Sequence, residues 1–210
     1  MNRKFTAIVL SLTFISLGGC ASMNSAECET GDWRAIGYED GSRGYTSDRF
    51  GDHRKACAKH GVTADFSSYQ EGRTAGLAEF CQPSRGFNLG SSGGNYNGVC
   101  SANREADFLD AYRAGQQLYT LRSNYNNAAS LIYSKERELE EIDIATGENA
   151  LLLISPETSN EDRVRLMTDM KHLSERKGKL EAEIKMLIVD RARYEQELRN
   201  YEQTVAAYGY

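Results

Sequence analysis

Apolar residues in the second half of the chain are spaced alternately by three and four positions. One series runs from Leu118 to Ile142 and another from Leu166 to Tyr208, interrupted only by Lys135, Lys177 and Arg191. A repeat of about 3.5 residues keeps one stripe of side chains facing a partner helix. The basic residues can extend their charges outwards while their stems pack. The pattern predicts two long helices joined as a coiled coil.

The segment between the two series is expected to reverse the chain. Gly147 and Pro156 disfavour a helix interior, and Ser155 before Pro156 is typical of a helix start. Helices from about residue 103 to 145 and from about 160 to 207 would each span roughly 60 to 70 Å, so an antiparallel hairpin is the simplest arrangement. Four apolar residues, 151 to 154, would stand at its tip. They would either cap the hairpin's own core or form a contact point for a partner.

The first half of the chain repeats an aromatic residue followed three positions later by glycine. The motif occurs at Tyr38, Tyr69, Phe87 and Tyr112, and three copies follow an aspartate-aromatic pair, at Asp32, Asp65 and Asp107. Aspartate before such a segment suits a helix N-cap. Because glycine lowers helix propensity by about 1 kcal/mol against alanine, its recurrence predicts close approach of another backbone or ring.

Two further segments complete the prediction for this half. The chain from about Asp48 to His60, ended by Gly61, is expected to form a helix. The glycine-rich run from Arg85 to Cys100 is expected to be an ordered loop. The fold class predicted is mainly α, with a small disulfide-stapled Gly/Tyr-rich domain at 20–102 and a long antiparallel coiled-coil hairpin at 103–210.

The N-terminus has the features of an export signal that ends in a lipid attachment site. Arg3 and Lys4 precede an apolar run too short to span a bilayer, which needs about 20 apolar residues. Leu17-Gly18-Gly19-Cys20 resembles a bacterial lipobox, which implies removal of residues 1–19 and acylation of Cys20. The alternative is a soluble secreted protein. No aspartate stands at the second mature position, which by resemblance to the Gram-negative sorting rule favours the outer membrane, facing the periplasm.

Charge excludes two classes of partner. Loss of Arg3 and Lys4 leaves 23 of the 25 Lys and Arg against 30 Asp and Glu, a net charge near −7 over the remaining 191 residues. Nucleic acid and anionic membrane faces both require a basic patch. We therefore expect no nucleic acid partner.

The cysteines indicate where the chain is cross-linked. Besides Cys20, there are four, Cys28, Cys57, Cys81 and Cys100, all in the first half. An even number in an oxidising compartment predicts two disulfides, with three possible pairings that remain open. The segment they would staple is poor in Leu, Ile and Val, and so thin a core usually needs cross-links.

The first half also resembles a known family. Shared features include Asp32-Trp33, Gly37-Tyr38, Asp40-Gly41, His53 and the four cysteines, together with the glycines and aromatics as far as Phe108. Over about residues 20 to 120 this resembles the bacterial lipoprotein family called domain of unknown function 2799. The resemblance implies location and architecture, and it implies no activity, catalytic residue or cofactor.

Several segments contain residue types that occur in functional sites. The stretch Ile36 to Tyr45 has the spacing G-x-x-x-G-x-x-G and adjacent acids, which does not fit a phosphate loop. His53, Cys57 and His60 could present metal ligands on one helix face, although a disulfide at Cys57 is the more economical prediction. We therefore predict no metal site.

Two further sets of residues could form a functional site. Asp32 with Asp40, or Asp65 with His53, could form a hydrolytic pair, but capping explains Asp32 and Asp65 equally well. The loop residues Phe87, Asn88, Asn95, Tyr96 and Asn97 suit carbohydrate contact or, more simply, turn formation.

The sequence thus favours a non-enzymatic outer-membrane lipoprotein without a cofactor. Its partners would be the membrane, through the N-terminal lipid, and an envelope protein or another copy of itself, through the coiled coil. The alternatives are a peptidoglycan-binding or cell-wall hydrolytic lipoprotein, and a metal-binding periplasmic domain.

Overall fold

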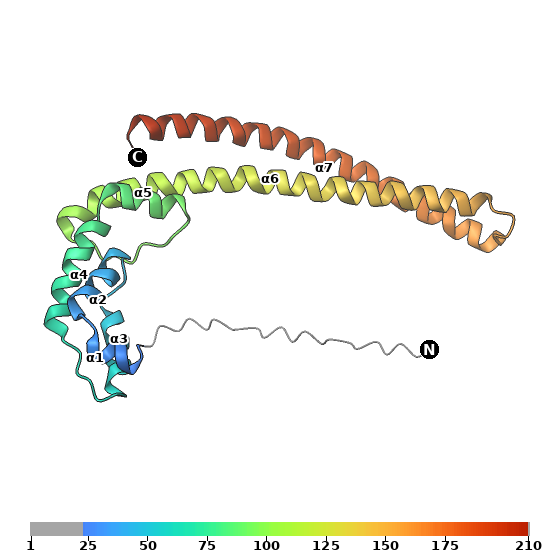
Figure 1. The fold of residues 1–210 in the computed structure, drawn as a ribbon. Helices are drawn as coiled ribbons and strands as arrows, with labels where there is room; N and C mark the ends of the chain where they lie inside the picture. Colours follow the sequence, from blue (N-terminus) through green and yellow to red (C-terminus); the bar gives the residue numbers. More distant parts are fainter. Residues whose placement is uncertain (1–22, 210) are drawn as a thin grey trace, which may run out of the picture.

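The protein consists of a small cluster of helices and a long helical arm (Figure 1). The computed structural model describes residues 23–209, and this range contains no strand. The helices are α1 (Ser25–Thr30), α2 (Trp33–Ser42), α3 (Asp48–Ala58), α4 (Phe66–Phe80), α5 (Pro83–Ser91), α6 (Ala102–Ile154) and α7 (Asn160–Ala207). The predicted fold class is confirmed. The signal segment 1–19 and Cys20 lie outside the described residues.

Glycines let α2 and α4 approach each other backbone to backbone. A β-carbon built on Gly72 would lie 2.7 Å from the carbonyl carbon of Arg34 and closer still to its oxygen. One built on Gly76 would lie 2.6 Å from the amide nitrogen of Ser42. Gly37 and Gly41 meet α4 in the same way from the other side. The glycine motif therefore serves close packing, as its recurrence predicts.

The same packing occurs a second time between α5 and the start of α6. A β-carbon on Gly90 would lie 2.8 Å from the amide nitrogen of Gln116, and one on Gly115 would lie 2.7 Å from that of Ser91. In each pair, the first helix is followed by a glycine with positive φ that lies against an aromatic ring. Gly44 follows α2, and Gly93 follows α5. The domain is thus an internal repeat, with α2 and α4 as unit one and α5 and α6 as unit two.

The two disulfides occupy equivalent places in the repeat. Cys28–Cys57 links the chain before α2 to the chain before α4, and Cys81–Cys100 links the chain before α5 to the chain before α6. The prediction of two disulfides is confirmed, and the structure selects one of the three pairings. Each bond closes the short loop of one unit, which compensates for the thin core.

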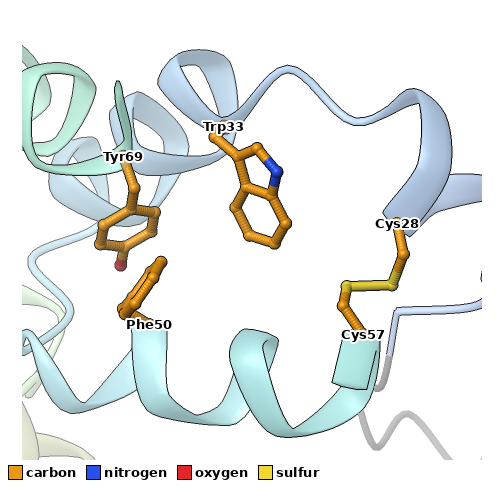
Figure 2. Packing of buried hydrophobic residues seen from close by; sticks show 5 residues of the cluster. All are labelled: Cys28, Trp33, Phe50, Cys57 and Tyr69. Carbon is orange, nitrogen blue, oxygen red and sulfur yellow. A yellow bond between two sulfur atoms is a disulfide. The ribbon is translucent and has the colours of Figure 1, made fainter. Parts of the chain in front are cut away.

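Each unit has its own aromatic core. In unit one, Phe50 of α3 lies between Trp33 of α2 and Tyr69 of α4, with ring centroids 6.2 and 4.9 Å away, beside the Cys28–Cys57 bond (Figure 2). In unit two, the fully buried ring of Phe108 lies 4.8 Å from that of Tyr96. The short helices thus enclose aromatic rings where a larger domain would bury aliphatic residues.

The two long helices form the predicted antiparallel hairpin. Every predicted seam residue is buried or half-buried except Tyr208. The register is marked by ion pairs between α6 and α7, at 2.6 to 2.9 Å: Arg122–Glu202, Lys135–Glu183, Arg176–Glu138 and Lys177–Asp143. Two basic seam residues, Lys135 and Lys177, therefore direct their charges to carboxylates on the other helix. No helix in the described range is long and apolar enough to cross a bilayer.

The turn of the hairpin differs from the prediction. Helix α6 continues through Gly147 to Ile154, because Gly147 is exposed and costs only its helix propensity. Ser155 ends α6 instead of starting α7. The N-cap of α7 is Ser159, whose hydroxyl accepts the amide proton of Asp162 at 3.1 Å. With 53 residues, α6 is about 80 Å long.

Two predictions for the first half also need correction. The segment from Arg85 to Cys100 is not all loop, since α5 covers Pro83–Ser91 and proline occupies its first turn. Asp107 caps nothing, because α6 already begins at Ala102 and Asp107 lies inside it. The predicted helix at Asp48 is confirmed as α3, and Gly61 after it has a φ of 74°. The predicted boundary at residue 103 falls at the start of a helix that serves both the repeat and the arm.

Candidate functional site

A buried polar cluster lies in unit one. Oδ2 of Asp40, on α2, accepts hydrogen bonds from His53 Nε2 at 2.9 Å and from the Tyr69 hydroxyl at 2.8 Å. Arg49 Nε lies 3.9 Å from the other carboxylate oxygen. Asp40 and His53 are 6% and 7% exposed. Three helices therefore converge on one carboxylate.

The carboxylate of Asp40 is held in its charged form. Burial raises its pKa, but the hydrogen bonds from His53 and Tyr69 and the charge of Arg49 outweigh burial and lower the pKa below its usual range. Burial and the hydrogen bond to Asp40 raise the pKa of Tyr69, so its hydroxyl remains a donor. His53 Nδ1 has no hydrogen-bond partner among the described residues, which suits the tautomer with its proton on Nε2.

The second unit shows that the fold does not require this cluster. From the glycine contacts, Leu89 occupies the place of Asp40, and Phe108 occupies the place of Tyr69. The motif comparison that aligned Tyr112 with Tyr69 is therefore offset by one helical turn. An apolar pair fills the equivalent core, so the polar cluster is a particular feature of unit one.

The chemistry open to this cluster is limited by its position. A general acid or base must come within hydrogen-bonding reach of its substrate, and here the potential groups point inward. The other predicted pairs are not assembled. Asp32 caps α2 through the amides of Arg34 and Ala35, and Asp65 caps α4 through the amide of Ser68 at 3.1 Å. His53 therefore pairs with Asp40 and not with Asp65.

The three potential metal ligands on α3 are separated by their roles. The sulfur of Cys57 is bonded to Cys28, His53 is buried against Asp40, and His60 is exposed beyond the end of α3. No group of three histidine, cysteine or acidic side chains in the range 23–209 could hold a metal ion. Sequence reasoning did not identify Arg49 and Tyr69 as partners of Asp40, because sequence separation hides the contact.

Two polar side chains of the glycine-rich loop, Tyr96 and Asn97, bond within the domain, whereas Asn88 of α5 and Asn95 are exposed. The Tyr96 hydroxyl donates to Glu105 and accepts the Cys100 amide proton, each at 2.9 Å. The Asn97 side chain donates to the carbonyl of Gly44 in unit one at 3.1 Å, and Phe87 is buried. These contacts favour turn formation over carbohydrate contact.

Several apolar side chains are exposed at the tip of the arm. The first, second and fourth side chains of the apolar run are exposed: Leu151, Leu152 and Ile154. Val164 and Met167 of α7 are exposed nearby in sequence. The alternative that the run caps the hairpin's own core therefore holds only for Leu153, which is half-buried.

Comparison with known proteins gives one relationship. Residues 32–117 match the family described as "Protein of unknown function (DUF2799)". No curated protein and no solved structure shows a significant match. The matched segment begins at the N-cap of α2 and ends in α6 just after Gly115, so it contains both glycine-packed helix pairs and leaves out the arm. The resemblance to this family predicted from the sequence is confirmed over residues 32–117.

Proposed function

We propose that this protein is a non-enzymatic lipoprotein of the outer membrane whose helical arm makes protein contacts in the cell envelope. The chain would be anchored by acylated Cys20, with the repeat domain close to the membrane and the arm available to a partner in the periplasm. Three sequence features support this proposal: the N-terminal signal pattern, the resemblance to a lipobox, and an alanine instead of an aspartate at the second position of the mature chain, Ala21.

The length of the arm is the observation that most supports this proposal. It is far longer than the domain needs, because α6 meets α5 only along its first turns while it runs about 80 Å in total. Near the domain, α7 packs back on α6, where the Tyr201 hydroxyl donates to the carbonyl of Ala114 at 2.9 Å. Helix α6 is thus held by α5 in the domain, and the last part of α7 is bonded to α6 at the same end of the arm. A long, supported hairpin is suited to holding a contact surface away from its anchor.

The proposal that the protein is not an enzyme rests on the burial of its candidate catalytic side chains and on the bonding of its cysteines. In the part of the chain that the structure describes, the titratable cluster around Asp40 is buried between its own helices, and its Asp40 and His53 side chains bond to each other. The four cysteines of the domain are consumed in disulfides, which removes them as nucleophiles.

The contact role is tested by cross-linking in intact cells. A photoreactive amino acid replaces Tyr133 or Val189 on the arm, or Phe66 on the domain, all of which are exposed. We expect discrete cross-linked products from the arm positions. Products from Phe66 alone would contradict the proposed role of the arm.

The anchor is tested separately. In Cys20→Ser we expect loss of incorporated labelled palmitate and release of the protein from the membrane fraction. Unchanged labelling and fractionation would refute the lipid anchor and leave the role of the arm to be judged by cross-linking.

A further inference from the structure

The tip of the arm presents apolar side chains on a fixed turn. Leu151 and Ile154 are 68% and 75% exposed at the end of α6, and Val164 and Met167 are exposed in the first turns of α7. We refer to these four residues and Leu152 as the tip patch. A cluster of this kind is a recognised mark of an interaction site.

The turn beneath the tip patch is held by hydrogen bonds from two side chains, Arg163 and Thr158. Arg163 donates to the carbonyls of Leu153, Ser155 and Thr158, the last two at 2.6 and 3.2 Å. The Thr158 hydroxyl donates to the carbonyl of Leu152 at 2.6 Å. The carbonyls of Leu152 and Leu153, in the last turn of α6, are therefore satisfied within the chain, and the backbone that carries the tip patch is held in place. A preorganised surface loses less conformational entropy on binding.

The surroundings of the tip patch are acidic. Residues 148 to 165 contain four carboxylates, on Glu148, Glu157, Glu161 and Asp162, against two guanidinium groups. Arg163 turns its group into the turn, and Arg165 is paired with Glu161 at 2.6 Å. A partner with lysine or arginine beside its apolar groups is therefore favoured, whereas anionic lipid is repelled. Two copies meeting tip to tip would bring like charges together.

A hollow beside the tip patch gives room for a side chain. Its volume is about 470 Å³. Its lining includes the apolar Leu152 and Leu166, the acidic Glu157 and Asp162, and Arg165, whose charge is paired with Glu161. Binding sites of this size place an apolar group in the hollow and a few polar groups around it. Both apolar and basic character are thus expected in the same short segment of the partner.

We propose that the tip patch is a docking site for an amphipathic protein segment that carries apolar side chains next to lysine or arginine. The proposal rests on the contact role of the arm proposed above, and it adds the location of the contact and the chemistry of the partner.

The first test uses purified full-length protein and a fluorescent 18-residue helical peptide made of leucine and lysine. The control peptide has glutamate in place of lysine. We expect fluorescence anisotropy to show binding of the lysine peptide only. The variant Leu152→Ser/Ile154→Ser should weaken binding roughly tenfold or more, because it removes two apolar anchors.

Matched variants separate the tip from the rest of the arm. Met186→Ser/Val189→Ser alters two similarly exposed residues in the middle of α7 and should leave binding within about twofold. Glu148→Lys/Glu157→Lys should weaken binding as much as loss of the apolar anchors. Circular dichroism verifies that each variant remains helical. Equal losses from the tip and middle variants, or binding of the glutamate peptide, would overturn the proposal.

Two other occupants give distinct results. Co-sedimentation with phosphatidylethanolamine and phosphatidylglycerol vesicles that depends on Ile154 would assign the tip patch to a membrane. A dimer in sedimentation velocity that disappears in the tip variant would assign it to a second copy. Either result overturns the proposal.

The final comparison is made in cells with photoreactive residues at 154 and 189. Products from position 154 whose attached peptide contains apolar and basic residues support the proposal. Products from 189 without products from 154 overturn it and leave the contact role of the arm standing, whereas no product from either position removes both.

Discussion

Adding one methyl group at Gly72 should open the interface between α2 and α4. The new β-carbon would lie 2.7 Å from the carbonyl carbon of Arg34 and closer to its oxygen, whereas real β-carbons essentially never approach within 3.0 Å. Overpacking costs about 1–3 kcal/mol, and the upper end applies because the obstacle is backbone. Alanine returns about 1 kcal/mol through helix propensity. We expect Gly72→Ala to lower the free energy of unfolding by about 2 kcal/mol, or the Tm by about 8–16 °C.

Trp33 reports this change directly. It is the chain's one tryptophan, and it is buried in unit one beside Phe50, so its fluorescence during denaturant unfolding follows the repeat domain and not the arm. The matched control is Gly51→Ala in α3, where a β-carbon would meet nothing within 4 Å. We expect this variant to gain up to about 1 kcal/mol. A Gly72→Ala midpoint equal to wild type, or equal losses in both variants, would refute the role given to the glycines.

Three further predictions concern charge, cross-links and the turn. Because the folded pKa of Asp40 lies below its unfolded value, the stability it contributes is present above the unfolded pKa and is lost as pH falls through the folded pKa. The difference in urea midpoint between wild type and Asp40→Asn should therefore shrink on acidification below about pH 4, and a constant difference would contradict this. Replacing Cys28 and Cys57 together by serine should cost about 3.6 kcal/mol for a separation of 29 residues in the loop-entropy relation; an unchanged denaturant midpoint by Trp33 fluorescence would show that this bond does not stabilise the domain. Arg163→Met should speed amide hydrogen exchange at Ser155, Glu157 and Thr158 and leave the Trp33 midpoint unchanged, so exchange at the wild-type rate would argue against its role in the turn.

The two helices of the arm could be predicted well from the sequence because their buried residues recur at a regular spacing. The seam from Leu118 to Ile142 follows from spacing alone, and the structure buries or half-buries each position. The end of α6 could not be predicted in the same way. Gly147 has only a moderate helix penalty and no steric demand, and the turn depends on Arg163 reaching back to α6, a contact without a sequence signature.

In the candidate sites, residues that act locally could be predicted, but contacts between residues far apart in the sequence could not. The sequence identified the cysteines, the capping role of Asp32 and Asp65, and the glycines, because each acts through local chemistry. It did not connect Asp40 with Tyr69, which are 29 positions apart and meet only after α2 and α4 pack. The repeat itself was obscured because the copies match by packing position, with Phe108 in the place of Tyr69, and not by residue type.

Because α6 is one continuous helix, the position of the tip relative to the domain depends on the number of residues between them. The helix is gripped through Gly115 at one end and carries the tip patch at the other, without a proline between them. In an α-helix each residue adds about 1.5 Å and about 100° of rotation. A single residue inserted in both helices of the arm would therefore turn the seam residues beyond it by about 100° away from the partner helix. A whole heptad inserted in both helices would keep the seam facing the partner and move the tip about 10 Å farther from the domain. The segment between Gly115 and Leu151 thus sets the distance of the tip from the domain in steps of one heptad.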